Sequence, residues 1–123
     1  MSDIILAKIP PVATIILNRP DDLNRLTLES MALLGEIVDD MASDDAIHAV
    51  VVTGTGDAVF SAGLLNPDIR AALSKDEVIA FVRLANRVFD SLAALPQIVI
   101  AAINGNILAG AVELALACDI RLA

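Results

Sequence analysis

The stretch VIAAINGNILAGAVELALACDIRLA, residues 99–123, decides the fold. With the two residues before it, its apolar start predicts a buried strand over 97–103, which turns at Asn104-Gly105-Asn106 into a helix around Glu113. The last residues, 119–123, look like the beginning of another strand. A strand, a helix and a further strand in this order indicate an α/β fold with parallel pairing.

The same alternation extends toward the N-terminus. Strands are predicted at 3–9 and 12–18, on either side of a Pro10-Pro11 turn, and at 47–54; helices are predicted from 27 to about 43 and from 74 until Pro96. Thr27 is the expected N-cap of the first helix, and Ser74 and Glu77 have capping-box spacing in the second. Apolar residues at helical period predict the buried faces, which are Met31, Leu34, Val38 and Met41 in the first helix and Val78, Phe81, Val82, Ala85, Val88, Phe89 and Leu92 in the second.

The composition excludes several classes of protein. Hydrophobic residues make up 57% of the chain, more than is usual for a free-standing soluble domain, so we expect much of its surface to be covered by something. The net charge of -8 and the 2% of aromatic residues argue against a nucleic-acid surface. Charges, Pro and Gly interrupt every apolar stretch before it could span a membrane, and MSDIILAK lacks the basic start of a signal peptide. We expect a cytoplasmic protein without a membrane partner.

Several side chains could carry chemistry in principle, but their sequence context favours structural roles. Cys118 lies in an apolar run and is expected to be a packed thiol, and His48 is expected to be structural or exposed. The aspartates at 39, 40, 44 and 45 are expected to be a solvated face, with Mg²⁺ or Ca²⁺ as the alternative. GTGD lacks the third glycine of a dinucleotide loop. We expect no metal site and no resident cofactor.

Glu113 is a single carboxylate in the run AGAVELALA. Its neighbours three and four positions away on a helix are apolar, so we expect the side chain to be buried. Burial disfavours the charged form of a carboxyl group and raises its pKa toward the range useful for proton transfer. Glu113 is therefore a candidate acid/base. The alternatives are a helix carboxylate satisfied by a structural partner and one that points to solvent at a turn of the helix.

Two loops rich in small residues could bind a negatively charged oxygen. The turn before Glu113 leaves backbone amides uncovered near a helix N-terminus. In TGTGDAVFSAGLLNPD, Gly63 would let the backbone approach a ligand closely, and the amide of Leu64 could be a second donor. The alternative is that these glycines only form tight turns and allow close packing.

Three segments, VATIILNRP, AVVVTGTGDAVFSAG and the opening stretch, resemble the crotonase superfamily, also called the enoyl-CoA hydratase/isomerase family. They occur in that family's order and spacing and cover nearly the whole chain. The resemblance implies a superhelix of repeated ββα units. It also implies an enzyme that binds acyl-CoA thioesters and stabilises the enolate formed from the thioester carbonyl.

The resemblance also implies roles for particular residues. By matching position, the oxyanion amides fall on Leu64 and Gly110, and the hydratase glutamate falls on Glu113. The carbonyl that receives the adenine amino group falls on Ala62, next to Gly63. The segment that contacts CoA contains Leu23, Asn24, Arg25 and Leu26, and Arg25 is the basic residue best placed to meet a CoA phosphate.

The chain departs from the family pattern in three respects. AGA replaces a run of three glycines, which keeps Gly110 but adds a methyl group on either side. Asp68 is displaced from the family's acid position and is either its equivalent or a turn and helix-capping residue. The second hydratase glutamate and the trimer-forming helices are expected beyond Ala123. We therefore interpret residues 1–123 as the N-terminal part of one domain, truncated to about half a crotonase.

The expected reaction is syn addition or elimination of water across an α,β-unsaturated acyl-CoA. Coenzyme A enters only as part of the substrate. A double-bond isomerase, which can operate with one carboxylate, is the alternative within the fold. A noncatalytic acyl-CoA-binding or assembly protein is the alternative from another class. The full-length form is expected to be a homo-oligomer, either a trimer or a hexamer.

Overall fold

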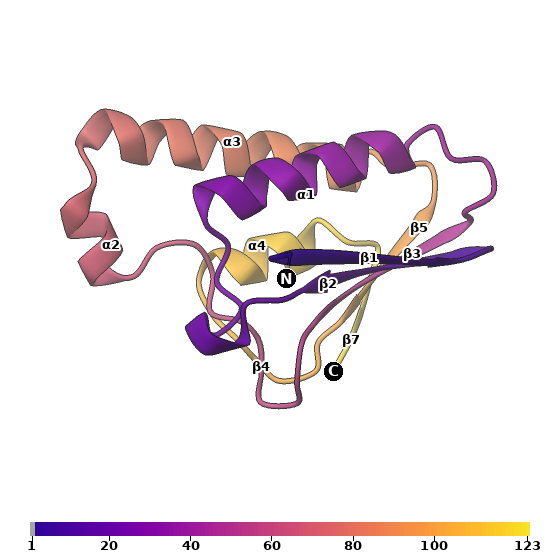
Figure 1. Cartoon of the computed structure of the whole chain (residues 1–123). Coiled ribbons are helices and arrows are strands. Elements are labelled where there is room, and N and C mark those ends of the chain that lie inside the picture. Colours follow the sequence, from indigo (N-terminus) through magenta and orange to yellow (C-terminus); the bar gives the residue numbers. More distant parts are fainter. Residues whose placement is uncertain (1) are drawn as a thin grey trace.

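A computed structural model describes residues 2–123 as one α/β unit (Figure 1). The strands are β1 (Ile4–Ile9), β2 (Val12–Leu17), β3 (Ala49–Gly54), β4 (Val59–Ser61), β5 (Ile98–Ala102), β6 (Asn106–Ile107) and β7 (Ile120–Leu122). The helices are α1 (Leu28–Met41), α2 (Pro67–Ala72), α3 (Lys75–Ala93) and α4 (Gly110–Leu116), with a short 3₁₀ turn at Pro20–Asp22. The long elements confirm the predicted alternation.

Five strands form the main sheet in the order β1-β2-β3-β5-β7. Only β1 and β2 pair antiparallel, as expected for strands joined by a two-proline turn, and β2, β3, β5 and β7 run parallel. Val50 lies between Ala13 and Val99 in the register, and all three side chains are buried. This register fixes which face of each strand meets the helices, because a slip of one residue between strands would turn the buried apolar side chains to the opposite face.

The helices α1 and α3 lie side by side along the sheet (Figure 1). The four predicted core residues of α1 are all at most 1% exposed. The two helices approach closely at Gly35, where a Cβ atom would lie 3.1 Å from Cγ2 of Val88. In α3 the predicted buried face is confirmed at Phe81, Ala85, Val88, Phe89 and Leu92. Val78 is only half-buried and Val82 is exposed, so the predicted face is too wide at these two positions.

The predicted helix starts are confirmed at the level of single hydrogen bonds. The Ser30 amide donates to Oγ1 of Thr27 over 3.1 Å. At α3 the Glu77 amide donates to Oγ of Ser74 over 3.1 Å, and the Ser74 amide donates to Oε1 of Glu77 over 3.0 Å. Each pair satisfies amides that a helix leaves without partners in its first turn.

Three short elements were not predicted from the sequence. The strands β4 and β6 form a separate two-stranded parallel sheet, and α2 follows β4. The N-cap of α2 is Asn66, whose Oδ1 accepts a hydrogen bond from the Ile69 amide over 2.8 Å. Asp68 lies in the first turn of this helix and is exposed. Its position fits the turn interpretation of that residue and places it near the positive end of the helix dipole.

Candidate active site

The two small-residue loops predicted from the sequence lie against each other. Gly63 has φ +99°, and a Cβ atom there would lie 3.0 Å from the Gly110 amide nitrogen and 3.0 Å from the Leu108 carbonyl oxygen. In return, a Cβ atom on Gly110 would lie 2.8 Å from Cγ of Leu64. Glycine is required at both positions because any side chain would push the loops apart. The small sheet holds this arrangement, since Leu108 donates to the Ser61 carbonyl over 3.1 Å.

The loops leave two amides without acceptors. Within residues 2–123, neither the Leu64 amide nor the Gly110 amide donates a hydrogen bond. The amides around them are used: Gly63 donates to Oγ of Ser61 over 3.1 Å, and Ala111 donates to the Leu108 carbonyl over 3.1 Å. Both free donors belong to half-buried residues. Two unpaired amides on adjoining loops can donate to one oxygen that carries negative charge.

The predicted CoA segment, 23–26, runs beside Ala62 and Gly63, which directly follow β4. Ala62 donates to the Leu23 carbonyl over 3.0 Å, and Leu26 donates to the Gly63 carbonyl over 2.9 Å. Nη1 of Arg25 donates to the Ala62 carbonyl oxygen over 3.3 Å. The oxygen assigned to adenine therefore already accepts one hydrogen bond, and its second lone pair can still accept another.

The four residues of this segment differ sharply in what they can offer a ligand. Leu23 is 47% exposed, whereas Leu26 is only 1% exposed and belongs to the core. Asn24 is buried, and its side chain binds the Arg19 amide and the carbonyls of Thr55 and Val59. The side chains of Asn24 and Leu26 therefore shape the loop, and the backbone and Leu23 provide its outer surface.

Arg25 is 9% exposed, although the sequence suggests it for a phosphate contact. Its Nε atom has no hydrogen-bond partner in the described chain and lies 3.6 Å from Oδ1 of Asp22. The guanidinium is turned toward the Ala62 carbonyl rather than toward solvent. A phosphate contact by Arg25 would require the side chain to leave this position.

The expected burial of Glu113 is wrong for the described chain, because its side chain is exposed. The apolar residues beside it on α4 are themselves uncovered, with Val112 41% and Leu116 63% exposed. The apolar neighbours therefore do not enclose the carboxylate. The inference from burial to an acid/base role for Glu113 has no support in the described chain. Glu113 lies one turn after Gly110 on α4, so both face the same side of that helix.

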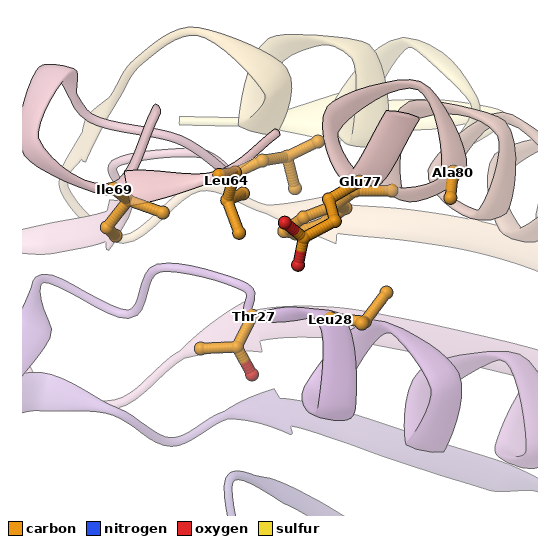
Figure 2. A pocket seen from close by; sticks show the side chains of 8 residues that line it. Thr27, Leu28, Leu64, Ile69, Glu77 and Ala80 are labelled. Atoms are coloured by element: carbon orange, nitrogen blue, oxygen red, sulfur yellow. The ribbon is translucent and has the colours of Figure 1, made fainter. Parts of the chain in front are cut away.

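Glu113 and Leu64 line different hollows. A shallow hollow between α3 and α4 has Glu113, Asp90 and Phe89 among its lining residues. A separate apolar cavity of about 260 Å³ is lined by Leu64 together with the starts of α1 and α3 and by α2 (Figure 2). The structure thus brings Leu64, Gly63 and Gly110 together and places the Glu113 carboxylate outside the cavity that Leu64 lines.

The remaining predictions concern chemistry away from these loops. Cys118 is 5% exposed, and burial raises the pKa of its thiol to about 11, which confirms a packed thiol. His48 is exposed. Over residues 2–123, no three His, Cys, Asp or Glu side chains come together in a way that could hold a metal ion. In that same range no helix is both long and apolar enough to cross a membrane.

The parallel sheet, the β4-β6 pair and the two facing loops define a crotonase-type fold. Residues 9–123 match the family described as enoyl-CoA hydratase/isomerase. The chain belongs to this family and corresponds to the N-terminal part of its fold.

Solved and curated relatives agree with this assignment. The crystal structure of an enoyl-CoA hydratase from Bacillus anthracis superposes with a TM-score of 0.92 at 35% identity, over 98% of this chain and 46% of that chain. YngF of Bacillus subtilis, grouped by its name with the enoyl-CoA hydratases/isomerases, is 45% identical over 91% of this chain and 43% of its own length. The short-chain-enoyl-CoA hydratase of Clostridium acetobutylicum is 35% identical over 100% of this chain and 47% of its own length. The chain spans about half the length of these relatives.

Proposed function

We propose that this chain is the thioester-binding part of an enoyl-CoA hydratase that adds water to an α,β-unsaturated acyl-CoA. The observation that carries the proposal is the pair of unpaired amides at Leu64 and Gly110 on two loops in contact. The names of the similar proteins, which are mainly hydratases, support the same reaction.

In the proposed reaction the two amides donate to the thioester oxygen. Negative charge grows on that oxygen when water's hydroxyl adds to the β-carbon, and fixed donors stabilise the resulting enolate more than the ground-state carbonyl. Glu113 then accepts a proton from the water and transfers a proton to the α-carbon of the product. The adenine amino group would donate to the Ala62 carbonyl, and Leu23 would cover part of the nucleotide. Coenzyme A is part of the substrate, and no further cofactor is needed.

The test uses a form with a complete crotonase fold, either a longer natural form of the protein or a fusion to the second half of a family member. Glu113→Gln keeps the volume and hydrogen-bonding capacity of the side chain but cannot transfer a proton. We expect turnover of crotonyl-CoA to fall roughly 10²-fold or more, with acyl-CoA affinity largely kept. Parent-rate turnover by this variant would remove Glu113 from the mechanism and leave the isomerase or binding alternatives.

Two companion measurements test the amide pair. Gly110→Pro deletes one donor and is expected to lower turnover strongly, with circular dichroism as the check on folding. Gly110→Ala adds the same Cβ atom against Leu64 but keeps the amide, so it is the control for the steric effect and should lower turnover less. Calorimetry should show tighter binding of an acyl-CoA than of the matching free acid, because the nucleotide supplies most of the contacts. Equal affinity for the two ligands would refute the CoA assignment.

One observation favours a noncatalytic acyl-CoA-binding protein as the second candidate. Glu113 is exposed and lines a different hollow from Leu64. In that case the amide pair would bind the thioester and the complete protein would show no turnover. Glu113→Gln would then leave the acyl-CoA affinity unchanged.

We also propose a cytoplasmic location and a homo-oligomeric full-length form, a trimer or hexamer. The similarity to bacterial enoyl-CoA hydratases supports the first, and the uncovered apolar face of α4 supports the second. Cell fractionation and sedimentation of a complete form test these two points.

A further inference from the structure

The cavity beside Leu64 is positioned to receive the acyl group. Leu64 contributes its side chain to the lining and its amide to the donor pair, so a thioester oxygen held by that amide lies next to the cavity. Leu28, Ile69, Leu73, Ala80 and Phe81 make the rest of the wall mostly apolar. A cavity of about 150 Å³ holds a six-carbon ring, so 260 Å³ offers room for roughly ten carbon atoms.

One charged residue interrupts this apolar wall. Among the eight described residues that line the cavity, Glu77 alone carries a charge. Figure 2 shows its carboxylate projecting into the space between Leu64 and the start of α1, where Thr27 and Leu28 lie. Thr27 adds no counter-charge, and its hydroxyl is already paired with Ser30.

The Glu77 carboxylate is both fixed and ionised. The Ser74 amide donates to Oε1 over 3.0 Å, which anchors the side chain at the end of the cavity. This backbone hydrogen bond is also the main reason that the pKa of Glu77 lies below its ordinary value. The negative charge is therefore present at neutral pH and cannot swing far away without breaking the helix cap.

We propose that Glu77 makes this site selective for neutral acyl chains and disfavours acyl groups that carry a second carboxylate. The inference rests on the proposed function, because it takes the acyl-CoA to be held by the Leu64 and Gly110 amides. A chain that enters the cavity from Leu64 approaches Glu77, and a terminal carboxylate there would meet a like charge. Glu77 is exposed, so water screens part of the repulsion. We expect a discrimination of roughly tenfold rather than a complete block.

A purely structural role for Glu77 makes a different prediction. As a helix cap only, Glu77 would affect stability, and its charge would not change the ranking of ligands. The decisive quantity is therefore a ratio of affinities for two ligands of equal shape and different charge.

Glutaconyl-CoA and 5-methylhex-2-enoyl-CoA form such a pair, since an isopropyl group replaces the carboxylate at the end of the same chain. Calorimetry on the complete form described above gives both affinities. The parent is expected to prefer the neutral ligand, and Glu77→Gln, which keeps an oxygen to accept from the Ser74 amide, is expected to reduce this preference roughly tenfold. Asp76→Asn is the matched control, because it removes a charge from the same helical turn but lies outside the cavity lining. Its ratio is expected to equal that of the parent.

A second variant tests the same idea by adding charge. Ala80→Lys places an ammonium group on the cavity wall and is expected to raise glutaconyl-CoA affinity roughly tenfold relative to the neutral ligand. An unchanged ratio in Glu77→Gln overturns the selectivity by Glu77 and leaves the proposed function intact, whatever the result for Ala80→Lys. If neither acyl-CoA binds more tightly than its free acid, the proposed function and the selectivity are both overturned.

Discussion

Ala109 holds an uncommon backbone conformation immediately before the proposed donor at Gly110. Its φ of 52° and ψ of -128° lie in a region that residues with a Cβ atom rarely adopt. Such a conformation costs on the order of 1–3 kcal/mol and persists only where the surroundings enforce it. Gly63 packs against this turn, next to the Leu108 carbonyl and Cβ of Ala109. The strain supports a site at this point in the fold, because a structural turn alone would be less costly with glycine.

The residue scale also shows where sequence reasoning reaches its limit. The two small-residue loops could be picked out from the sequence because small residues and turns are local features, whereas the pairing of the Leu64 and Gly110 amides came from the family resemblance. The exposure of Glu113 could not be predicted, since it depends on which elements cover α4. The inward turn of Arg25 likewise depends on the Ala62 carbonyl, 37 residues away in sequence.

Cys118 gives a pH-dependent prediction. Burial raises the pKa of its thiol from 9.0 to about 11, so the native thiol stays protonated where an unfolded thiol ionises. This group contributes stability that is fully present below pH 9 and is lost as the pH rises toward 11. Alkylation by iodoacetamide at pH 8 is expected to be slow in the native chain and fast in urea.

Urea unfolding at several pH values measures the stability part of this prediction. Cys118→Ala removes the titrating group, and the difference between parent and variant should shrink from pH 9 to pH 11. Native alkylation as fast as in urea would contradict the packed thiol.

At the scale of elements, two asparagines connect the site loops to the sheet. The Asn104 side chain donates to the carbonyls of Gly54 and Gly56 and accepts from the Gly54 amide and the Thr53 hydroxyl. Asn24 closes the other side of the same turn with bonds to Thr55 and Val59. These contacts join the end of β3 to the end of β5, from which the two site loops continue.

The long elements were predictable and the short ones were not, for a physical reason. α1 and α3 show several turns of apolar period and caps that are readable in the sequence. β4 has three residues and β6 has two, which is too short for any period to appear. Their pairing depends on Gly105, where a Cβ atom would overlap the Ala58 carbonyl group. The only sequence feature specific to this sheet was Gly105, and its contact, Ala58, lies far away in the sequence.

Asn104→Ala tests the connection between these elements. The variant leaves partly buried backbone groups at Gly54 unpaired and is expected to lower the free energy of unfolding by about 1–3 kcal/mol. Urea denaturation measures the loss. Asn106→Ala is the matched control, because the Asn106 side chain is exposed at the start of β6, and it should change stability by less than about 0.5 kcal/mol. Equal effects of the two substitutions would show that the Asn104 bonds do not hold the loops.

At the scale of the whole molecule, one group of exposed apolar residues lies on α4 and β7. Leu116 is 63% exposed and Leu122 57%, with Val112 and Ile120 also exposed on α4 and β7. β7 is the last strand of the main sheet, so one of its edges carries backbone groups that no described strand pairs. Part of the apolar surface that was expected to need a cover thus lies on α4 and β7.

This surface predicts that the 123-residue chain does not behave as a monomer. Exposed apolar patches and open strand edges favour association, since pairing removes both from water. Sedimentation velocity at micromolar concentration is expected to show species heavier than the 12.8 kDa chain. The control variant Leu116→Asp with Leu122→Lys places charges on α4 and β7 and should shift the distribution toward monomer, because charges on a strand edge oppose pairing. A monodisperse 12.8 kDa parent would show that this face is stable in water without a cover.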